Sequence, residues 1–494
     1  MNLALIKAPS IDWWAIAPIS ALTVGGVLVL LAGLIGNQKL RSALVPMLAF
    51  DTFAAAAVLL IMRWNDPVTA VAGALRIDNI TAALGSICLL AGAVAVVLSL
   101  RSDTEATLGA GEYHSLLVFT VLGMVVLIAA NDLVTVFAGL ELLSIPLYVL
   151  CAAELKRERS LESGIKYLIV GSVGSATLLY GSAFVYGAAG TTAFEGITAA
   201  MFGSALSSNP LATDPLMLGG MALMIVGIAF KASIAPFHQW TPDVYEGAPT
   251  PITSFMAVAT KAAAFGLAVR LLLGPLLPAV DQWQPVLAAL AVVTIVVGNA
   301  GALGQESVKR MLAWSSVAQA GYLLAGVTVA TELGVQAFTF YIVVYAAMTI
   351  AAFAVITEVE RTGVDGDRLS GFAGLGRTRP ALAVVMTISM LSLAGLLAGF
   401  FGKVELINAL ATAHFSWLAI VLVVGSLVSF GYYLRVVAAM WLGDTDAAPS
   451  GARRAPEATA VAVLAAFAVI ALTVAPTWAL ERSGEVSKSL VSSR

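Results

Sequence analysis

Five basic residues lie inside apolar stretches of the chain that are otherwise almost free of charge. They are Lys166, Lys231, Lys261, Lys403 and Arg435. A lysine at the middle of a membrane costs about 2.5–3.5 kcal/mol on insertion scales, so it is expected only where it works or is paired. Burial disfavours the ammonium form and a nearby carboxylate restores it, which makes the pKa of such a lysine adjustable. The chemistry that these residues predict is therefore uptake and release of protons within a membrane.

Each basic residue also has a structural interpretation that must be set beside the functional one. Lys166 lies about one turn into its segment and could snorkel to the headgroups, and Lys403 could lie near the outer end of a tilted span. Lys231 could be paired for packing only. Lys261 is close to the centre of its segment, where snorkelling is difficult, whereas Arg435 is expected to snorkel.

Acidic residues that could tune these lysines are few. Glu141 lies about ten residues into an apolar segment that Pro146 should kink. We interpret it as the carboxylate that sets the pKa of a nearby lysine, with Lys166 as its expected partner, although a merely structural role stays open. Asp51 fits either a relay carboxylate or a polar packing group. Glu405 follows Lys403 by two residues, so the two do not share a helix face.

The stretch "FKASIAPFHQWTPDVYEGAPTP" begins at Phe230 and places a helix break directly after Lys231. Pro236 removes a backbone donor, and unpaired backbone groups survive in a membrane only where they are buried in protein or line a cavity. A hydrated cavity beside an ionisable lysine suits proton transfer. His238, with Asp243 and Glu246 nearby, is expected in the loop after the break. There it could collect protons at a pore mouth or serve only as a hydrogen-bonding loop residue.

The elements that position these residues follow from the composition. Of 494 residues, 60% are hydrophobic and only 11% are charged, which indicates an integral membrane protein. We predict an all-α polytopic fold with about 14 transmembrane helices. Segment 380–413 is too long for one straight span and contains Gly395, Gly399 and Gly402, so we expect a broken helix there. The predicted cores are residues 14–35, 43–62, 79–100, 114–130, 132–152, 162–187, 215–235, 250–274, 283–303, 308–330, 336–358, 380–413, 416–442 and 456–480.

The charge distribution predicts an orientation and argues against several functions. Fourteen loop lysines and arginines fall on one side of the predicted topology and seven on the other, so both termini should face outside. The first apolar segment lacks the pattern of a cleaved signal peptide. A net charge of -3 gives no support to nucleic-acid binding. Cys88 and Cys151 are isolated and are expected to be small buried hydrophobes, and no nucleotide-binding motif is present.

Several stretches together resemble the antiporter-like membrane subunits of respiratory complex I. They are "FAGLELLSIPLYVL", "ESGIKYLIVGSVGSATLLYG", "FKASIAPFHQWTPDVYEGAPTP", "VKRMLAWSSVAQAGYLL" and "LAGFFGKVEL". Within that family, "PFHQWTPDVYEGAPT" is most similar to members of the N type. The resemblance covers predicted helices four to thirteen, and the block at residues 230–251 is its most specific part.

The resemblance implies a division of the chain and a role for it. Residues 1–110 would hold three helices, residues 111–275 and 276–445 two inverted five-helix repeats, and residues 446–494 the last helix, with the seventh and twelfth helices broken. The chain would translocate protons as a subunit of an NADH–quinone oxidoreductase in a bacterial plasma or inner membrane. It would carry no cofactor itself. NADH, FMN, iron–sulfur clusters and quinone would belong to partner subunits in the same complex.

By the same resemblance, the charged residues receive individual roles. Glu141 and Lys166 would form an acid–lysine pair, and Lys231 would be the central lysine of the first half. Lys261 would connect the halves and Lys403 would release protons outside.

Two positions depart from the family pattern. Leu396 and Leu397 stand where a pair of prolines is usual, which puts the form of the second break in doubt. Gln319 stands where many members have histidine, and it cannot titrate near neutrality.

Two other functions remain as alternatives. One is a subunit of a multisubunit Na⁺/H⁺ antiporter or of a membrane hydrogenase, which use related subunits. The other is a structural membrane subunit without transport.

Overall fold

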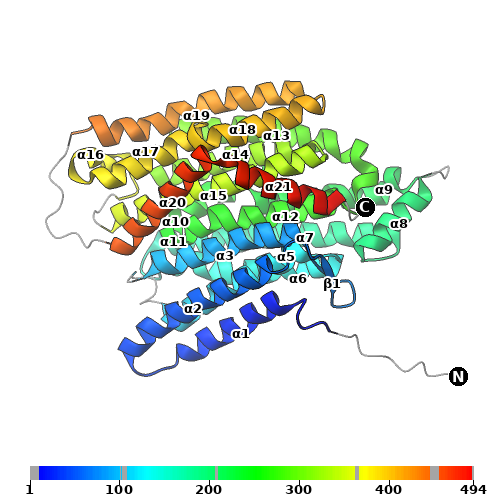
Figure 1. Ribbon diagram of the computed structural model, residues 1–494, viewed down its shortest axis with the longest axis horizontal. Coiled ribbons are helices and arrows are strands. Elements are labelled where there is room, and N and C mark those ends of the chain that lie inside the picture. Colours follow the sequence, from blue (N-terminus) through cyan, green and yellow to red (C-terminus); the bar gives the residue numbers. More distant parts are fainter. Residues whose placement is uncertain are drawn as a thin grey trace.

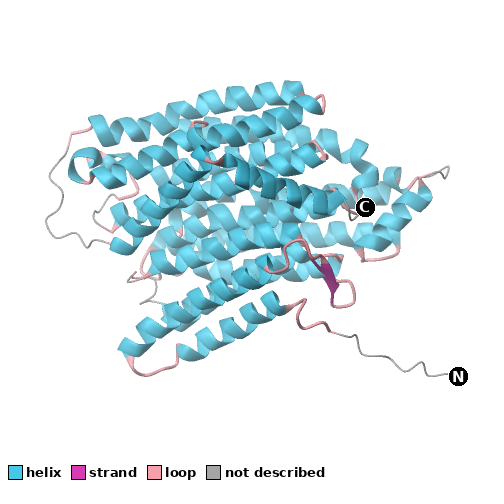
Figure 2. Ribbon diagram, in the orientation of Figure 1, coloured by secondary structure: helices cyan, strands magenta, loops and turns pink. Residues whose placement is uncertain are grey.

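The structure is a computed structural model that describes residues 11–100, 102, 108–205, 210–361, 366–444 and 455–491. It is a bundle of long helices that run roughly parallel or antiparallel to one another (Figure 1). One short β-hairpin, formed by β1 (Val68–Ala70) and β2 (Leu75–Ile77), is the only sheet among the described residues (Figure 2). The predicted all-α polytopic membrane fold is confirmed.

The first half of the chain supplies the helices that carry Lys231 and Lys261. They are α1 (Ala17–Ala32), α2 (Gln38–Ile61), α3 (Asn79–Ser99), α5 (Ala110–Ala129), α6 (Leu133–Cys151), α7 (Glu158–Ala189), α8 (Phe194–Ser204), η1 (Leu211–Thr213), α9 (Pro215–Ala232), α10 (Trp240–Gly247), α11 (Thr250–Phe255), the π turn η2 (Met256–Thr260) and α12 (Lys261–Leu272).

The second half supplies the surroundings of Lys403. Its elements are η3 (Leu277–Ala279), α13 (Val280–Leu303), α14 (Val308–Thr328), α15 (Glu332–Glu360), η4 (Leu369–Phe372), α16 (Leu375–Thr378), α17 (Pro380–Ala394), α18 (Leu397–Thr412), α19 (Ser416–Leu442), α20 (Pro456–Val474) and α21 (Pro476–Val491).

Each predicted apolar segment has a helical counterpart. Twelve helical segments of the described chain are long and apolar enough to cross a membrane, and α1 is a shorter apolar helix. The last segment differs from its prediction because α20 ends at Val474 and a separate helix, α21, begins at Pro476. Proline suits the first turn of a helix and cannot continue the preceding one, which explains the division there.

The centre of the bundle is the continuous segment α11–η2–α12. Every residue from 250 to 272 is buried. In Figure 1, α1 and α19 lie at opposite edges of the bundle, with this segment between them. Large apolar side chains remain exposed on the outside, among them Leu442, Leu464 and Phe467, as a lipid-facing surface requires.

Close helix contacts depend on glycine. A Cβ atom added to Gly181 on α7 would lie 2.7 Å from the backbone nitrogen of Met224 and 2.8 Å from the carbonyl oxygen of Gly220, both on α9. Small residues that allow backbones to approach are typical of interfaces between membrane helices. This contact fixes α9, and with it Lys231, against α7.

The two ends of the bundle differ in their loops. The β1–β2 hairpin lies at one end, which we call the hairpin end, and α10 and α11 lie toward the opposite end, which we call the pocket end (Figure 1). At the hairpin end, Arg270 donates to Asp78 at 2.7 Å and to the carbonyl oxygen of Ile128 at 2.6 Å. This buried contact ties α12 to the start of α3 and the end of α5.

Candidate functional site

Three of the four lysines that interrupt apolar segments are deeply buried. The exposed fractions are 3% for Lys231, 0% for Lys261 and 4% for Lys403. Lys231 lies in the last turn of α9, Lys261 directly follows the π turn η2, and Lys403 on α18 reaches back with its side chain to a second break. Each buried ammonium group therefore occurs beside an irregular piece of helix, where backbone polar groups lose their regular partners.

Lys231 is held by side chains from two other helices, and a third helix supports them. Its Nζ donates to Ser144 Oγ on α6 at 2.8 Å and to Tyr167 Oη on α7 at 3.0 Å. The ring of Tyr167 stacks on Trp240 of α10 with centroids 4.6 Å apart. The Trp240 indole donates to the carbonyl oxygen of Phe230 at 3.0 Å, so the segment that follows the break folds back and closes the lysine site.

The first predicted break is confirmed, and it occurs before the proline. Helix α9 ends at Ala232, and Ser233 adopts a left-handed conformation with φ of 63°. Thr241 Oγ1 donates to Ser233 Oγ at 2.9 Å, and the backbone N–H of Ala235 donates to Thr294 Oγ1 at 3.0 Å. The Thr294 hydroxyl thus replaces a backbone partner for Ala235. The Thr241–Ser233 contact ties α10 to the residue at which the helix is interrupted.

Glu141 lies on α6 three residues before Ser144, so the two side chains share a helix face. Its carboxylate is partly buried and lies on the face of α6 that carries Ser144, the hydrogen-bond partner of Lys231. Among the described residues, no ion pair of Glu141 is formed. Its negative charge is therefore available to favour the charged form of Lys231 without a direct contact.

The ion pair expected between Glu141 and Lys166 is not present in the part of the chain that the structure describes. Lys166 Nζ instead lies 2.6 Å from Glu162 Oε1 and 3.1 Å from Asp243 Oδ2, with 44% of its side chain exposed. Glu162 precedes Lys166 by one helical turn, and Asp243 on α10 faces it across the pocket end. These two carboxylates lie nearer to Lys166 than Glu141 does. The exposed fraction of the Lys166 side chain agrees with its interpretation as a residue near the membrane surface.

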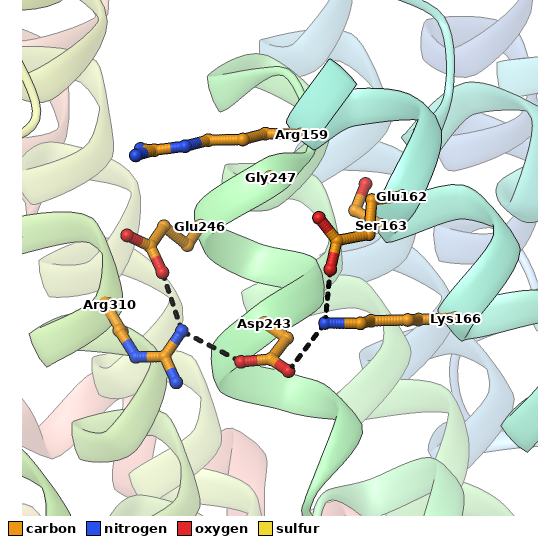
Figure 3. A pocket seen from close by; sticks show the side chains of 8 residues that line it. All are labelled: Arg159, Glu162, Ser163, Lys166, Asp243, Glu246, Gly247 and Arg310. Carbon is orange, nitrogen blue, oxygen red and sulfur yellow. Dashed lines mark hydrogen bonds and ion pairs between the residues drawn. The ribbon is translucent and has the colours of Figure 1, made fainter. Parts of the chain in front are cut away.

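Lys166 borders a charged pocket at the pocket end. The lining side chains are those of Arg159, Glu162, Ser163, Lys166, Asp243, Glu246 and Arg310, together with Gly247 (Figure 3). In Figure 3, Lys166 and Arg310 approach Asp243 from opposite sides.

Asp243 is the centre of the ion pairs in this pocket. Arg310 Nη1 lies 2.8 Å from Asp243 Oδ1 and 2.6 Å from Glu246 Oε2. Partial burial by itself would raise the pKa of Asp243, but the hydrogen bonds from Lys166 and Arg310 hold that pKa below its usual value. Asp243 is therefore ionised at neutral pH and keeps Lys166 at the pocket.

His238 does not lie at the mouth of this pocket. It is 7% exposed, and its ring packs edge-on against Trp314 with centroids 5.3 Å apart. The break at Ser233 turns the chain back into the bundle instead of into a solvated loop, which explains why His238 is buried and not at a pore mouth.

Lys261 differs from Lys231 because no described side chain or carbonyl bonds its ammonium group. Its Nζ has no hydrogen-bond partner among the described residues. The preceding turn, η2, is a π turn, a rare distortion that occurs frequently at functional sites. The position of Lys261 is therefore set by the backbone of this turn and by the packing around it.

Lys403 is held by carbonyl groups at the C-terminus of α17. Its Nζ donates to the carbonyl oxygens of Leu393 at 3.1 Å and Ala394 at 3.0 Å, the last two residues of α17. These carbonyls form the negative end of that helix, which favours a cation. The ammonium also lies 4.9 Å from the ring centroid of Tyr322.

The second break forms without prolines. Gly395 adopts φ of 115°, Leu396 is extended and Leu397 adopts φ of 51°. Gly399 and Gly402 lie within α18 and do not contribute to the break. They allow close contact instead, because a Cβ atom at either position would collide with the Ser392 carbonyl or the Tyr341 ring.

Gln319 on α14 lies at the same carbonyl as Lys403. Its Nε2 donates to the oxygen of Leu393 at 3.3 Å and to Tyr433 Oη at 3.4 Å, while its Oε1 accepts from the hydroxyl of Tyr341. The amide thus orients two tyrosines beside Lys403.

Sequence reasoning missed the hydroxyl groups of this site. Tyr167, Tyr341, Tyr345 and Tyr433 are all buried and contact the lysine surroundings through their Oη atoms. Tyrosine in an apolar segment is also typical of membrane interfaces, so residue type alone does not separate the two. A tyrosine in the middle of a segment, instead of at its ends, is a signal that could have found Tyr345 and Tyr433, whereas Tyr167 and Tyr341 lie about one turn into their predicted segments.

The other charged residues lie outside this group. Asp51 is exposed on α2 and approaches none of the buried lysines. Arg435 is exposed and donates to the carbonyl oxygen of Leu303 at 2.5 Å, as expected for a snorkelling side chain. Cys88 and Cys151 are both buried and unbridged.

The fold and the buried lysines define a polytopic membrane protein of the ion-translocating class, with interrupted helices near its charged residues. Residues 130–429 match the transmembrane family described as NADH:quinone oxidoreductase/Mrp antiporter. The chain belongs to this family, and within it to the relatives named NADH-quinone oxidoreductase subunit N.

Individual relatives match over nearly the whole length. Subunit N from Chloroflexus aggregans is 39% identical over 97% of this chain and 98% of its own. Subunit N from Trichlorobacter lovleyi is 40% identical over 86% and 87%, respectively. A chain in the structure of respiratory complex I from Thermus thermophilus aligns with a TM-score of 0.78 and 32% identity, covering 94% of this chain and 98% of that chain. A chain of a membrane-bound sulfane sulfur reductase aligns with a TM-score of 0.84 and 25% identity, covering 97% of both.

Proposed function

We propose that the chain translocates protons as a membrane subunit of an NADH–quinone oxidoreductase. The observation that carries this proposal is the burial of Lys231, Lys261 and Lys403 beside three interruptions of helices. An ammonium group with adjustable pKa, set among hydroxyl and carbonyl groups instead of fixed ion pairs, is suited to hold a proton temporarily. Lipid and the other subunits of the complex would surround the bundle.

The roles of the individual residues follow from their contacts. Lys231 receives a proton while the charge of Glu141 favours its ammonium form. Lys166, now paired with Glu162 and Asp243, would weaken that effect if it moved toward Glu141. The proton of Lys231 would then pass to Lys261 and on to Lys403. His238 is buried away from the pocket, so its proposed part in proton uptake would be internal.

The overall arrangement is part of the same proposal. Residues 111–275 and 276–445 would form two inverted repeats, each containing one broken helix. The hairpin end would face outside and the pocket end the cytoplasm, because Arg159 and Arg310, with other basic residues, lie at the pocket end. The basic residues at 7, 101, 453, 454 and 494 that entered this prediction lie outside the described residues, as do both extreme ends of the chain.

Redox chemistry is assigned to partner subunits. Among the described residues, no group of three or more His, Cys, Asp or Glu side chains is arranged to hold a metal ion. The nicotinamide, flavin, iron–sulfur and quinone sites would lie in the other subunits of the enzyme. This chain would contribute the part of the reaction that moves protons.

The test is Lys231→Ala in the assembled complex, with Lys488→Ala on the exposed surface of α21 as the matched control. We expect the Lys231 variant to assemble but to lose proton pumping, while the control pumps normally. Normal electron transfer with undiminished pumping in the Lys231 variant would refute the proposal. A Na⁺-dependent gradient in place of a proton gradient would favour the antiporter alternative, and defective assembly with intact pumping would favour the structural one.

A further inference from the structure

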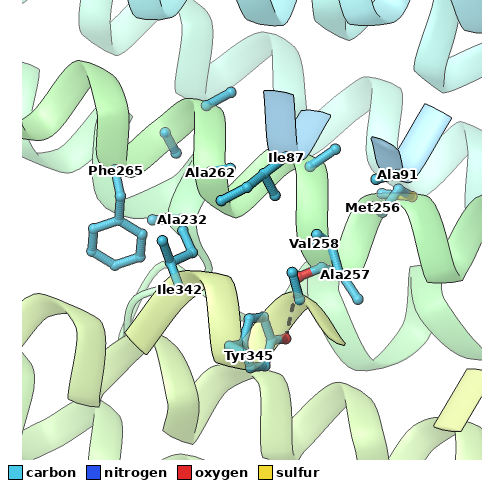
Figure 4. Close-up of a cluster of buried hydrophobic side chains, with 14 of the residues drawn as sticks. Ile87, Ala91, Ala232, Met256, Ala257, Val258, Ala262, Phe265, Ile342 and Tyr345 are labelled. Carbon is cyan, nitrogen blue, oxygen red and sulfur yellow. Dashed lines mark hydrogen bonds between the residues drawn. The ribbon is translucent and has the colours of Figure 1, made fainter. Parts of the chain in front are cut away.

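The π turn before Lys261 is fixed by a hydroxyl group from another helix. Tyr345 Oη on α15 donates to the carbonyl oxygen of Ala257 at 3.2 Å. Figure 4 shows the Tyr345 hydroxyl directed at this carbonyl. Tyr345 is 1% exposed, so the bond is made away from water, where an unpaired hydroxyl is costly.

This carbonyl is the one that a regular helix would use to hold Lys261. In an α-helix the backbone N–H of Lys261 would donate to the oxygen of Ala257, four residues earlier. Here the N–H of Lys261 donates instead to the oxygen of Val258, three residues earlier, so the α-helical bond to Ala257 is not made. The carbonyl of Ala257, which lacks this backbone partner, accepts from the hydroxyl of Tyr345 instead.

Two more side chains bind carbonyls of the same turn. Thr260 Oγ1 donates to the oxygen of Met256 at 2.6 Å, and Cys88 Sγ on α3 lies 3.5 Å from the oxygen of Ala259. The Thr260 bond is local to the turn and the Cys88 contact is a weak one. Tyr345 is therefore the stronger contact that reaches this turn from a neighbouring helix.

Tyr345 also connects the turn to the second half of the chain. Its hydroxyl lies 3.0 Å from Ser316 Oγ on α14. Ser316 precedes Gln319 by three residues, so both face the same side of α14, and Gln319 shares the Leu393 carbonyl with Lys403. The Tyr345 hydroxyl thus contacts the same face of α14 that carries Gln319, the residue beside Lys403.

We propose that Tyr345 is a positioning residue for Lys261, which it acts upon through the π turn at residues 256–260. Conversion of this turn to regular α-helix would rotate the following residues by about 100°, the angle that separates consecutive residues in an α-helix. Because Lys261 Nζ has no hydrogen-bond partner among the described residues, the backbone decides which way the lysine points. This inference rests on the proposed function, since Lys261 matters only if protons pass over it.

The experiment is Tyr345→Phe in the assembled complex, which removes the hydroxyl and keeps the ring. The matched control is Tyr113→Phe, because Tyr113 makes a comparable buried contact with Ser99 at 2.7 Å, away from the lysines. We expect the Tyr345 variant to assemble and to pump about five-fold more slowly with a changed pH profile. The five-fold factor is the loss of one net hydrogen bond of about 1 kcal/mol, converted to a rate ratio with about 1.4 kcal/mol for each tenfold change. The control should pump like the unmodified complex.

A double variant and a structure separate positioning from general damage. Adding Tyr345→Phe to Lys261→Met should have no further effect on pumping, and the structure of the Tyr345 variant should show residues 256–260 as regular α-helix. Additive loss, or normal pumping with the π turn retained, would overturn the role of Tyr345. Normal pumping by Lys261→Met alone would instead overturn the proposed function, so the two failures are distinguishable.

Discussion

The buried ion pair between Arg270 and Asp78 should stabilise the helix that carries Lys261. Arg270 and Asp78 have side chains only 5% and 1% exposed. Arg270 also donates to Thr81 Oγ1 at 3.0 Å and to the carbonyl oxygen of Ile128 at 2.6 Å. Arg270→Met would remove all three contacts. The buried Asp78 carboxylate would keep Arg76 at 3.3 Å as its remaining cation, together with its cap contacts to Thr81.

The expected loss follows from what remains after the substitution. Removing one partner of a buried ion pair costs about 3–5 kcal/mol. Because Arg76 still faces Asp78, we expect a loss of about 3 kcal/mol, or roughly a hundredfold in the folding equilibrium. In Arg270→Met/Asp78→Asn the buried charge is gone and asparagine still caps α3. The remaining loss should then be about 1–2 kcal/mol, chiefly the hydrogen bond to Ile128.

The assay is equilibrium unfolding of the purified protein in detergent micelles at several pH values. Burial alone would raise the pKa of Asp78, but the Arg270 guanidinium holds that pKa below its ordinary value. The contribution of the pair is therefore complete above the unfolded pKa of about 3.9 and is lost as the pH falls through the lower folded pKa. The difference between the unmodified protein and Arg270→Met should be constant from about pH 5 to pH 9. A double variant less stable than Arg270→Met would refute this reasoning.

Three further predictions concern the site and its packing. Gly181→Ala should destabilise the α7–α9 contact by about 1–3 kcal/mol in the same assay, whereas Gly203→Ala, which meets nothing within 4 Å, should not; equal effects would contradict the packing argument. Glu141→Gln should slow pumping more than Asp243→Asn, because the half-exposed Asp243–Lys166 pair is worth about 1 kcal/mol or less; the reverse order in vesicle assays would be evidence against it. Gln319→Leu should destabilise by about 1–3 kcal/mol by leaving the Tyr341 hydroxyl unpaired, and Gln319→His should restore stability; equal melting of both variants would argue otherwise.

Hydrophobicity and the cost of buried charge predicted the main features correctly. Every predicted apolar segment has a helical counterpart, and both predicted breaks occur, at Ser233 and Gly395. The burial of Lys231, Lys261 and Lys403 also followed from sequence. These features depend on local composition, which a single sequence contains.

The partners of the charged groups depend on how helices pack, which local composition does not determine. Lys166 pairs with Asp243 because α10 folds back after a break whose direction no local pattern indicates. Its pairing with Glu162, four residues earlier, could have been predicted from helical spacing alone. The π turn before Lys261 depends on Tyr345, which is 84 residues away in the sequence. The conformation at the second break was also not predictable, because Leu397 adopts a left-handed conformation that its residue type disfavours.

The central claim is that protons pass over Lys231, Lys261 and Lys403 in series. The most direct measurement is the proton-pumping rate of the assembled complex in vesicles, with each lysine replaced singly by methionine and with all three replaced together. If the lysines act in series, every single variant should fall to the same residual rate as the triple variant. If the single losses add up to the triple loss, or if any single variant pumps normally, protons do not follow this route.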